Sequence, residues 1–185
     1  MKKLIALMLC GILAVAGLGG CGATKEESTV SNVTAGEVFD AINAAFAEKY
    51  ADMDVEGAIP NMPMDIDDTT LQEKFGIDPE ITEDYKGQIA GMMTNCDMLL
   101  VVKAKDGKLE DVVKGLEKGK EAQQAAFESY GVMGNLERLD ASKIVTNGNY
   151  AALLMVGIMD TEAETVDFTE DVKLAEDTFN NTING

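Results

Sequence analysis

The stretch DMLLVVKAKDGKLEDVVKGLEKGKEAQQAAFESYG, residues 97–131, decides how the rest of this chain can fold. Its first part is predicted as a strand, Met98–Ala104, and Met98–Val102 is apolar on both faces, which is typical of a strand covered on both sides. Asp106-Gly107 ends this strand. A long helix follows and ends at Gly131, because apolar side chains recur there at the spacing of one helix face: Leu109, Val112, Val113, Leu116, Ala126, Phe127 and Tyr130.

A second strand of the same kind occurs near the end of the chain. Residues 149–158 are predicted as a strand, and Tyr150–Ile158 is apolar on both faces. Asn147-Gly148 before it is the strongest short signal for a tight hairpin, with Lys143–Thr146 as the partner strand. Strands that are apolar on both faces are expected at the centre of a sheet whose two faces are both covered.

The predicted strands form two hairpins with the long helix between them. Gln88–Met93 and the turn at Thr94–Asp97 complete the first hairpin. This order predicts an α+β fold with a mainly antiparallel four-stranded sheet, strand order 1-2-4-3, and the long helix on one face. Gly115 and Gly119 lower helix propensity but would let this helix approach another element closely. Terminal helices are expected on the other face. If they do not cover it, a partner subunit must, so a homodimer is the alternative arrangement.

Both ends of the predicted domain are helical. Thr34-Ala35-Gly36-Glu37 has the pattern of a capping box, and the apolar spacing after it predicts a helix to near Asp52. The last helix spans about Phe168–Ile183 and places four apolar side chains on one side: Val172, Ala175, Phe179 and Ile183.

The segment between the first helix and the first hairpin is less regular. Asp54–Asp68, the acidic loop, contains two prolines and scattered acids. Thr70-Leu71-Gln72-Glu73 offers a second capping box for a short turn that ends at Gly76. Asp78-Pro79-Glu80 is predicted to open another short helix through Tyr85.

The first 21 residues, MKKLIALMLCGILAVAGLGGC, have the order of a bacterial export signal. Lys2 and Lys3 precede an uncharged apolar run, Leu4–Leu18, and Leu18-Gly19-Gly20-Cys21 resembles the lipobox of bacterial lipoprotein precursors. In those precursors the cysteine thiol receives a diacylglycerol and becomes the first residue of the mature chain. Cys21 is therefore predicted as a lipid attachment site, with palmitate among its acyl chains, that anchors the protein on the extracytoplasmic face of the cell membrane.

Cleavage before Cys21 would divide the chain into three parts: a signal peptide, residues 1–20, a lipidated tether, residues 21–33, and one domain, residues 34–185. From Cys21 on, the chain has 13 basic and 33 acidic residues, a net charge of −20. Such a charge repels nucleic acid and an anionic bilayer alike. We expect no nucleic-acid partner, and a domain held off the membrane by its tether.

The residue inventory restricts the chemistry. The chain has no histidine and no tryptophan, and Cys96 is the only cysteine after Cys21. Histidine-dependent triads and most zinc and copper sites are thereby excluded, and no P-loop, G-x-S-x-G, G-x-G-x-x-G or C-x-x-C motif occurs. We expect a protein that is not an enzyme and has no cofactor or metal: a binding or interaction module of the cell envelope with an envelope protein as partner. The competing interpretations are an accessory solute- or metal-binding lipoprotein and a carboxylate-based envelope hydrolase.

One set of residues could serve a soft metal. Thioether and thiolate ligands suit Cu(I), and they gather here at Met92, Met93, Cys96 and Met98, with Met62 and Met64 as candidates nearby. Methionine also fills irregular cores without any ligand role. In a strand, moreover, Met92 and Met93 would point to opposite faces, so core packing is the simpler interpretation.

Two sets of acids are candidates for a calcium site or for hydrolysis. Oxygen ligands for Ca²⁺ occur at Asp65, Asp67 and Asp68, without the EF-hand spacing, so helix capping and a solvated loop explain them more simply. Carboxylates that could pair for glycoside hydrolysis, with a neighbouring tyrosine, occur at Asp78, Glu80, Glu83, Asp84 and Tyr85. Acids in the first turn of a helix are the simpler interpretation, since the chain has few aromatic residues for a sugar platform.

Several of these segments together resemble a known family. They are the lipobox, FGIDPEITEDY (Phe75–Tyr85), the strand–helix pair of residues 97–131 and IVTNGNYAALLMV (Ile144–Val156). The chain resembles clostridial lipoproteins classed only as a domain of unknown function, number 4358 in that series. The resemblance covers roughly Phe75–Val156, so the acidic loop and the tail after Ile158 lie outside it. It implies an outward-facing lipoprotein of a Gram-positive cell, and it implies no activity, ligand or active site.

Overall fold

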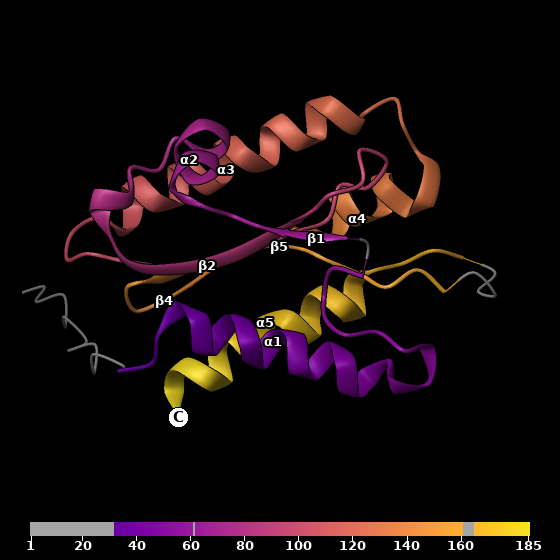
Figure 1. The fold of residues 1–185 in the computed structure, drawn as a ribbon, viewed down its shortest axis with the longest axis horizontal. Helices are drawn as coiled ribbons and strands as arrows, with labels where there is room; N and C mark the ends of the chain where they lie inside the picture. The colour runs from indigo at the N-terminus through magenta and orange to yellow at the C-terminus, as the bar shows by residue number, and fades with distance from the viewer. Residues whose placement is uncertain (1–31, 61, 161–164) are drawn as a thin grey trace, which may run out of the picture.

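A five-stranded antiparallel sheet lies at the centre of the molecule, with helices on both of its faces (Figure 1). The computed structural model describes residues 32–60, 62–160 and 165–185. The predicted signal peptide, Cys21 and the predicted tether as far as residue 31 lie outside the described residues. The strands follow the order β1-β2-β3-β5-β4; their bounds are Pro63–Asp65 (β1), Thr82–Ala90 (β2), Met98–Ala104 (β3), Lys143–Asn147 (β4) and Tyr150–Met155 (β5).

The two strands that are apolar on both faces are the inner ones, as predicted. β3 and β5 pair with each other, with Leu100 opposite Leu153 and Val101 opposite Ala152. Every residue of β5 is buried, and Lys103 is the one residue of β3 that is not. Because alternate side chains point to opposite faces of a strand, these two strands supply core residues to both sides of the sheet.

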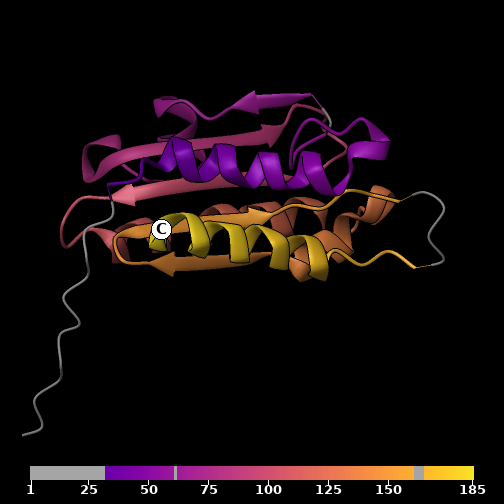
Figure 2. The ribbon, with the colours of Figure 1, turned by 90° about the horizontal axis from the view of Figure 1, so that it is seen from below.

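Each face of the sheet is covered by its own helices. α3 (Leu109–Phe127) and α4 (Asn135–Ala141) lie on one face, and α1 (Ala35–Lys49) and α5 (Thr169–Asn184) lie side by side on the other (Figures 1 and 2). α1 packs over β2 and β3, and α5 packs over β4 and β5. The terminal helices therefore cover most of the second face, over β2, β3, β4 and β5.

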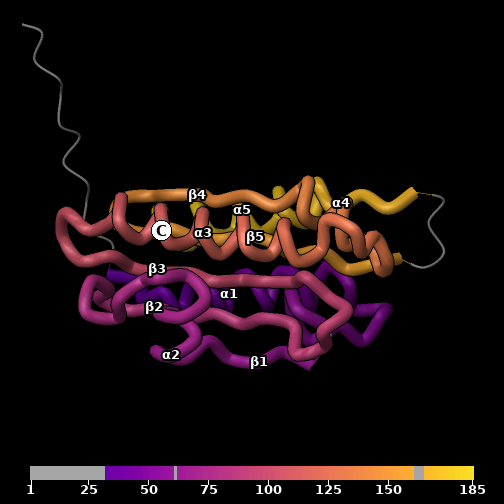
Figure 3. The backbone as a smooth tube through the Cα atoms, turned by 90° about the horizontal axis from the view of Figure 1, so that it is seen from above, coloured from indigo at the N-terminus to yellow at the C-terminus, as the bar shows by residue number. Residues whose placement is uncertain are grey.

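The predicted strand order is confirmed, but the number of strands is not. β1 adds a fifth strand at one edge, next to β2 (Figure 3). β2 starts at Thr82, where a helix through Tyr85 was expected; only Pro79–Ile81 forms a 3₁₀ turn. The cause is tertiary, because β2 pairs with β3 from Thr82 to Ile89, and such pairing outweighs a short local helix signal.

The helices differ from the prediction at three places. α3 ends at Phe127 rather than Gly131, and Ala126 and Tyr130 are exposed, whereas Gln123 is buried on the core side. α4 occupies a segment expected to be a loop. The short helix α2 (Asp68–Thr70) is capped by Asp67, whose side chain accepts a hydrogen bond from the Thr70 N–H, and not by Thr70 itself.

Other local expectations are confirmed. The Thr34 hydroxyl accepts from the Glu37 N–H at 3.1 Å, and the Glu37 carboxylate accepts from the Thr34 N–H at 2.7 Å, so the capping box of α1 forms. The turn after α2 ends at Gly76, whose φ of 69° favours glycine. The four side chains predicted for the inner side of α5 are buried: Val172, Ala175, Phe179 and Ile183.

The two glycines of α3 allow a close approach, as predicted. A Cβ at Gly119 would lie 2.3 Å from Cδ1 of Phe75, and a Cβ at Gly115 would lie 2.2 Å from Cγ1 of Ile77. Both distances are far below van der Waals contact. The segment after α2 can therefore pack directly on the backbone of α3.

Candidate functional site

The carboxylates considered for hydrolysis do not converge on one point. Asp78 accepts from the Glu80 N–H at 2.9 Å, as a first-turn cap. Asp84 accepts from the Ala35 N–H at 2.7 Å, so it caps the start of α1. Glu83 forms an ion pair with Lys103 at 3.3 Å. Each of these three acids has its own structural partner.

The three aspartates considered for Ca²⁺ are separated in the same way. Asp67 caps α2, Asp68 accepts from the Tyr85 hydroxyl, and Asp65 accepts from Nε2 of Gln88 at 3.0 Å. The hydrogen bond from Gln88 and that from Thr70 hold the pKa values of Asp65 and Asp67 below their usual range. In the described ranges, no three or more His, Cys, Asp or Glu residues gather as a metal ion would require.

The soft ligands are divided between the core and the surface. Cys96 and Met98 are fully buried, whereas Met93 is 94% exposed. Met62 does lie beside the 91–93 segment, since the Gly91 N–H donates to its carbonyl at 2.9 Å. Burial raises the pKa of the Cys96 thiol to about 11. A buried neutral thiol apart from the exposed thioethers does not form a Cu(I) site with them.

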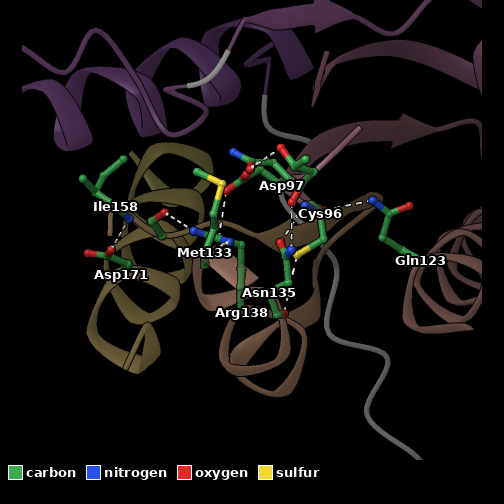
Figure 4. A network of polar contacts seen from close by, with 11 residues as sticks. Cys96, Asp97, Gln123, Met133, Asn135, Arg138, Ile158 and Asp171 are labelled. Atoms are coloured by element: carbon green, nitrogen blue, oxygen red, sulfur yellow. Dashed lines mark hydrogen bonds and ion pairs between the residues drawn. The ribbon is translucent and has the colours of Figure 1, made fainter. Parts of the chain in front are cut away.

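A buried polar cluster occupies the end of the sheet where α4 packs, and no motif in the sequence indicated it (Figure 4). We define it as Asp97, Asn135 and Arg138. Nε of Arg138 lies 2.8 Å from Oδ1 of Asp97, and both side chains are almost fully buried. Nη2 of Arg138 donates to the Gly157 carbonyl at 3.0 Å, and the guanidinium lies 4.3 Å from the centre of the Phe168 ring. Burial raises the pKa of the Asp97 carboxyl, and the Arg138 charge opposes that rise.

Asn135 ties the turn before β3 to α4. Its Oδ1 accepts from the Cys96 N–H at 3.1 Å, and its Nδ2 donates to the Thr94 carbonyl at 2.8 Å. Nε2 of Gln123 on α3 donates to the Cys96 carbonyl at 3.3 Å. These side chains satisfy backbone groups that the buried turn would otherwise leave without partners. The cluster is therefore part of the scaffold.

A second buried acid joins the terminal helices. Oδ2 of Asp171 accepts from the Ile158 N–H at 2.8 Å, while its Oδ1 accepts from Nζ of Lys49 at 2.6 Å and from the Tyr50 hydroxyl at 2.5 Å. Burial and this hydrogen bond raise the pKa of Tyr50. Asp171 thus fixes α5 against the end of α1 and against the segment after β5.

A groove of about 680 Å³ lies on the α1 side of the sheet, between α1, the neighbouring strands β1 and β2, and residues 53–60. β1 extends beyond the edge of α1, so the strip of sheet formed by β1 and β2 is left partly uncovered on this face (Figure 2). Pro63 and Asp65 of β1 and Lys86 and Gln88 of β2 line this strip. Asn43 of α1 holds the other wall, because its Oδ1 accepts from the Ala58 N–H at 2.9 Å.

The groove combines an apolar wall with an acidic rim. Its apolar residues are Phe39, Met53, Val55, Ile59, Pro60 and Pro63. Its rim carries three exposed acids, Asp40, Asp54 and Glu56, whose side chains make no hydrogen bond or ion pair within the described part of the chain. The cation of the groove, Lys86, lies 3.3 Å from Asp65 and is 5.9 Å from the centre of the Phe39 ring. A ligand in this groove would meet three carboxylates without partners and a lysine that already has one.

Comparison with protein families identifies the middle of this chain. The family described as Domain of unknown function (DUF4358) matches residues 56–156. The chain belongs to this family. No curated protein and no solved structure matches the chain.

The DUF4358 match begins earlier than the resemblance in the sequence indicated. It starts at Glu56, so most of the acidic loop lies inside it, contrary to expectation, while the tail after Ile158 lies outside it as expected. β1, β2 and the buried Asp97–Arg138 pair fall within the matched residues, whereas α1 and α5 fall outside them. The sheet side of the groove is thus part of the DUF4358 region, and its α1 wall is not.

Proposed function

We propose that this DUF4358 member is a lipid-anchored, extracytoplasmic binding module that holds its ligand in the groove between α1 and β2. The groove is the observation that carries the proposal. Its volume of about 680 Å³ is in the range of ligand sites, and its lining combines apolar side chains with a few polar ones, as such sites do.

The lipobox supports the proposed location of the protein at the cell membrane. Cys21 precedes the first described residue, Asn32, by 11 positions, and an extended chain of that length reaches roughly 35–40 Å. A diacylglycerol at Cys21 with a further acyl chain would anchor the protein stably, which one chain alone would not do. Among the described helices none has both the length and the apolar character needed to cross a membrane. The lipid is therefore the proposed attachment.

The groove favours binding over hydrolysis. A carboxylate-based hydrolase uses a general acid whose pKa is raised by burial, placed opposite a second carboxylate. The groove acids Asp40, Asp54 and Glu56 are exposed, and the buried acids Asp97 and Asp171 are held by ion pairs and hydrogen bonds of the scaffold. The binding interpretation needs only the exposed acids and apolar side chains that line the groove.

The anchor can be tested in cells. The full chain is expressed in a Gram-positive host that is fed an alkyne analogue of palmitate. We expect labelling of the protein, its loss in Cys21→Ser, and its retention in Cys10→Ser, the matched change at the cysteine inside the predicted signal. Protease added to intact cells should then remove the labelled protein's domain. Undiminished labelling of Cys21→Ser, or protection of the domain from protease, would contradict the proposal.

A further inference from the structure

We infer that the groove takes a peptide segment in which lysine or arginine side chains flank an apolar residue. This inference rests on the proposed function and specifies its ligand. Three properties of the groove lead to it: the arrangement of its apolar wall, the charge of its rim, and the ion pair that its lysine, Lys86, already forms with Asp65.

The apolar wall of the groove would bind the central, apolar residue of such a peptide. Phe39 of α1 and Ile59 are almost fully buried and form the floor of this space. The apolar side chains that remain exposed around it are Met53, Pro60 and Pro63. Pro63 lies opposite Ala90 in the register of β1 and β2, and Ala90 packs against the core on the α1 side, so Pro63 is on the α1 face of the sheet. An apolar side chain placed here leaves water for an apolar surface, which is the main source of affinity in sites of this kind.

The acids of the rim would attract the cationic side chains on either side of that residue. Asp40 lies on α1, and Asp54 and Glu56 lie on the segment that follows it, so the carboxylates come from two elements around the opening. None of the three has a partner in the described residues. Because these carboxylates are exposed, a bound cation gains attraction without the cost of burying a charge that lacks a partner.

The lysine of the groove does not reverse this preference. Nζ of Lys86 lies 3.3 Å from Oδ1 of Asp65, and Gln88 donates to the same oxygen at 3.0 Å. The Lys86–Asp65 pair is close to neutral, so the rim acids decide the charge of the groove. The net charge of −20 from Cys21 on has the same sign and would speed the arrival of a cationic partner while opposing an anionic one.

The test uses the full chain, processed and lipidated in a bacterial host and purified in detergent micelles. The probe is the tripeptide amide Lys-Phe-Lys with an amino-terminal fluorescein, and binding is followed by fluorescence anisotropy. Glu-Phe-Glu and norleucine-Phe-norleucine with the same label are the matched control peptides. We expect saturable binding of Lys-Phe-Lys that is at least tenfold tighter than binding of either control peptide.

Two triple variants distinguish the effect of the groove charges on binding from the effect of the protein's overall negative charge. Asp40→Asn, Asp54→Asn and Glu56→Gln together remove the three rim charges. Glu117→Gln, Glu121→Gln and Glu128→Gln together remove three exposed charges from α3 and its end, on the opposite face of the sheet. The groove triple is expected to weaken Lys-Phe-Lys at least tenfold, and the α3 triple less than twofold.

The outcomes distinguish this inference from the function on which it rests. Equal weakening by the two triples, or no saturable binding of Lys-Phe-Lys, would overturn the cationic-peptide ligand. If norleucine-Phe-norleucine bound as tightly as Lys-Phe-Lys and lost affinity on a change at the exposed groove residue Met53, Met53→Ala, the groove would bind ligands but the inferred charge preference would be wrong. Failure of the Cys21 labelling test would instead remove the anchored module itself.

Discussion

The buried polar cluster and the groove both contain ionisable side chains, but the fold uses them in opposite ways. In the cluster, Arg138 lies against Asp97, and its remaining polar atoms reach backbone carbonyls. In the groove, the rim acids Asp40, Asp54 and Glu56 are exposed and make no such contact within the described residues. The difference indicates where charge holds the fold together and where it is available to a ligand. Substitutions in both regions and one measurement of thiol reactivity test this comparison. The substitutions are given in decreasing order of their expected effect on stability.

The largest effect is expected for Arg138→Met. It leaves the buried Asp97 carboxylate without its cation, and breaking a buried ion pair in this way costs about 3–5 kcal/mol in the free energy of unfolding. Urea unfolding followed by circular dichroism measures the change. Lys173→Met is the matched control, because its pair with Asp177 is exposed on α5 and should contribute less than about 1 kcal/mol. Equal losses in the two variants would remove the distinction between buried and exposed pairs.

Asn135→Ala tests the neutral member of the cluster. It leaves the Cys96 N–H and the Thr94 carbonyl without their partner, and a buried unsatisfied group costs about 1–3 kcal/mol. The control is Asn181→Ala, an exposed position on α5, where we expect no loss or a slight gain from helix propensity. A variant Asn135→Ala as stable as the original chain would show that water replaces the lost hydrogen bonds.

The reaction rate of the Cys96 thiol measures how well the buried polar cluster and its surroundings exclude solvent. Its buried thiol, with a pKa raised to about 11, should react with a disulfide reagent at pH 8 at least 100-fold more slowly in the folded protein than in urea. The rate should rise about tenfold per pH unit below the pKa, because only the thiolate reacts. The Cys21 thiol is bonded to the diacylglycerol in the proposed mature protein, so it does not react with the reagent. Rapid reaction of the folded protein at pH 8 would contradict the burial of this thiol.

The smallest effects on stability are expected for the single rim changes Asp40→Asn, Asp54→Asn and Glu56→Gln. Exposed side chains without partners should change the free energy of unfolding by no more than about 0.5 kcal/mol. Asparagine suits position 54 because the φ of Asp54 is 54°, a conformation that asparagine tolerates. A loss above about 1 kcal/mol in any of them would show a structural role for that acid.

The core of the fold could be predicted from the sequence because its signals are local. β3 and β5 were identified by runs that are apolar on both faces, and α1 by the capping box at Thr34 and Glu37. Gly148 with a φ of 59° completes the predicted hairpin between β4 and β5. Each of these features depends on residues within a few positions of one another.

The remaining features depend on distant parts of the chain, and the sequence did not reveal them. β1 consists of three exposed residues and exists because it pairs with β2. Asp97 and Arg138 lie far apart in the sequence, and neither stands in a recognisable motif. The acidic loop was noted as a candidate cation site, but its relation to Asp40 and Phe39 of α1 required the fold.

The most direct test of the contrast between cluster and groove measures stability and binding in the same variant. The groove triple, Asp40→Asn with Asp54→Asn and Glu56→Gln, is compared with the unaltered lipidated chain by urea unfolding and by anisotropy titration with the Lys-Phe-Lys probe. We predict a free energy of unfolding that is unchanged or higher, since like charges are removed, together with at least tenfold weaker binding. A protein that lost stability while binding the probe with unchanged affinity would contradict the assignment of these acids to a ligand.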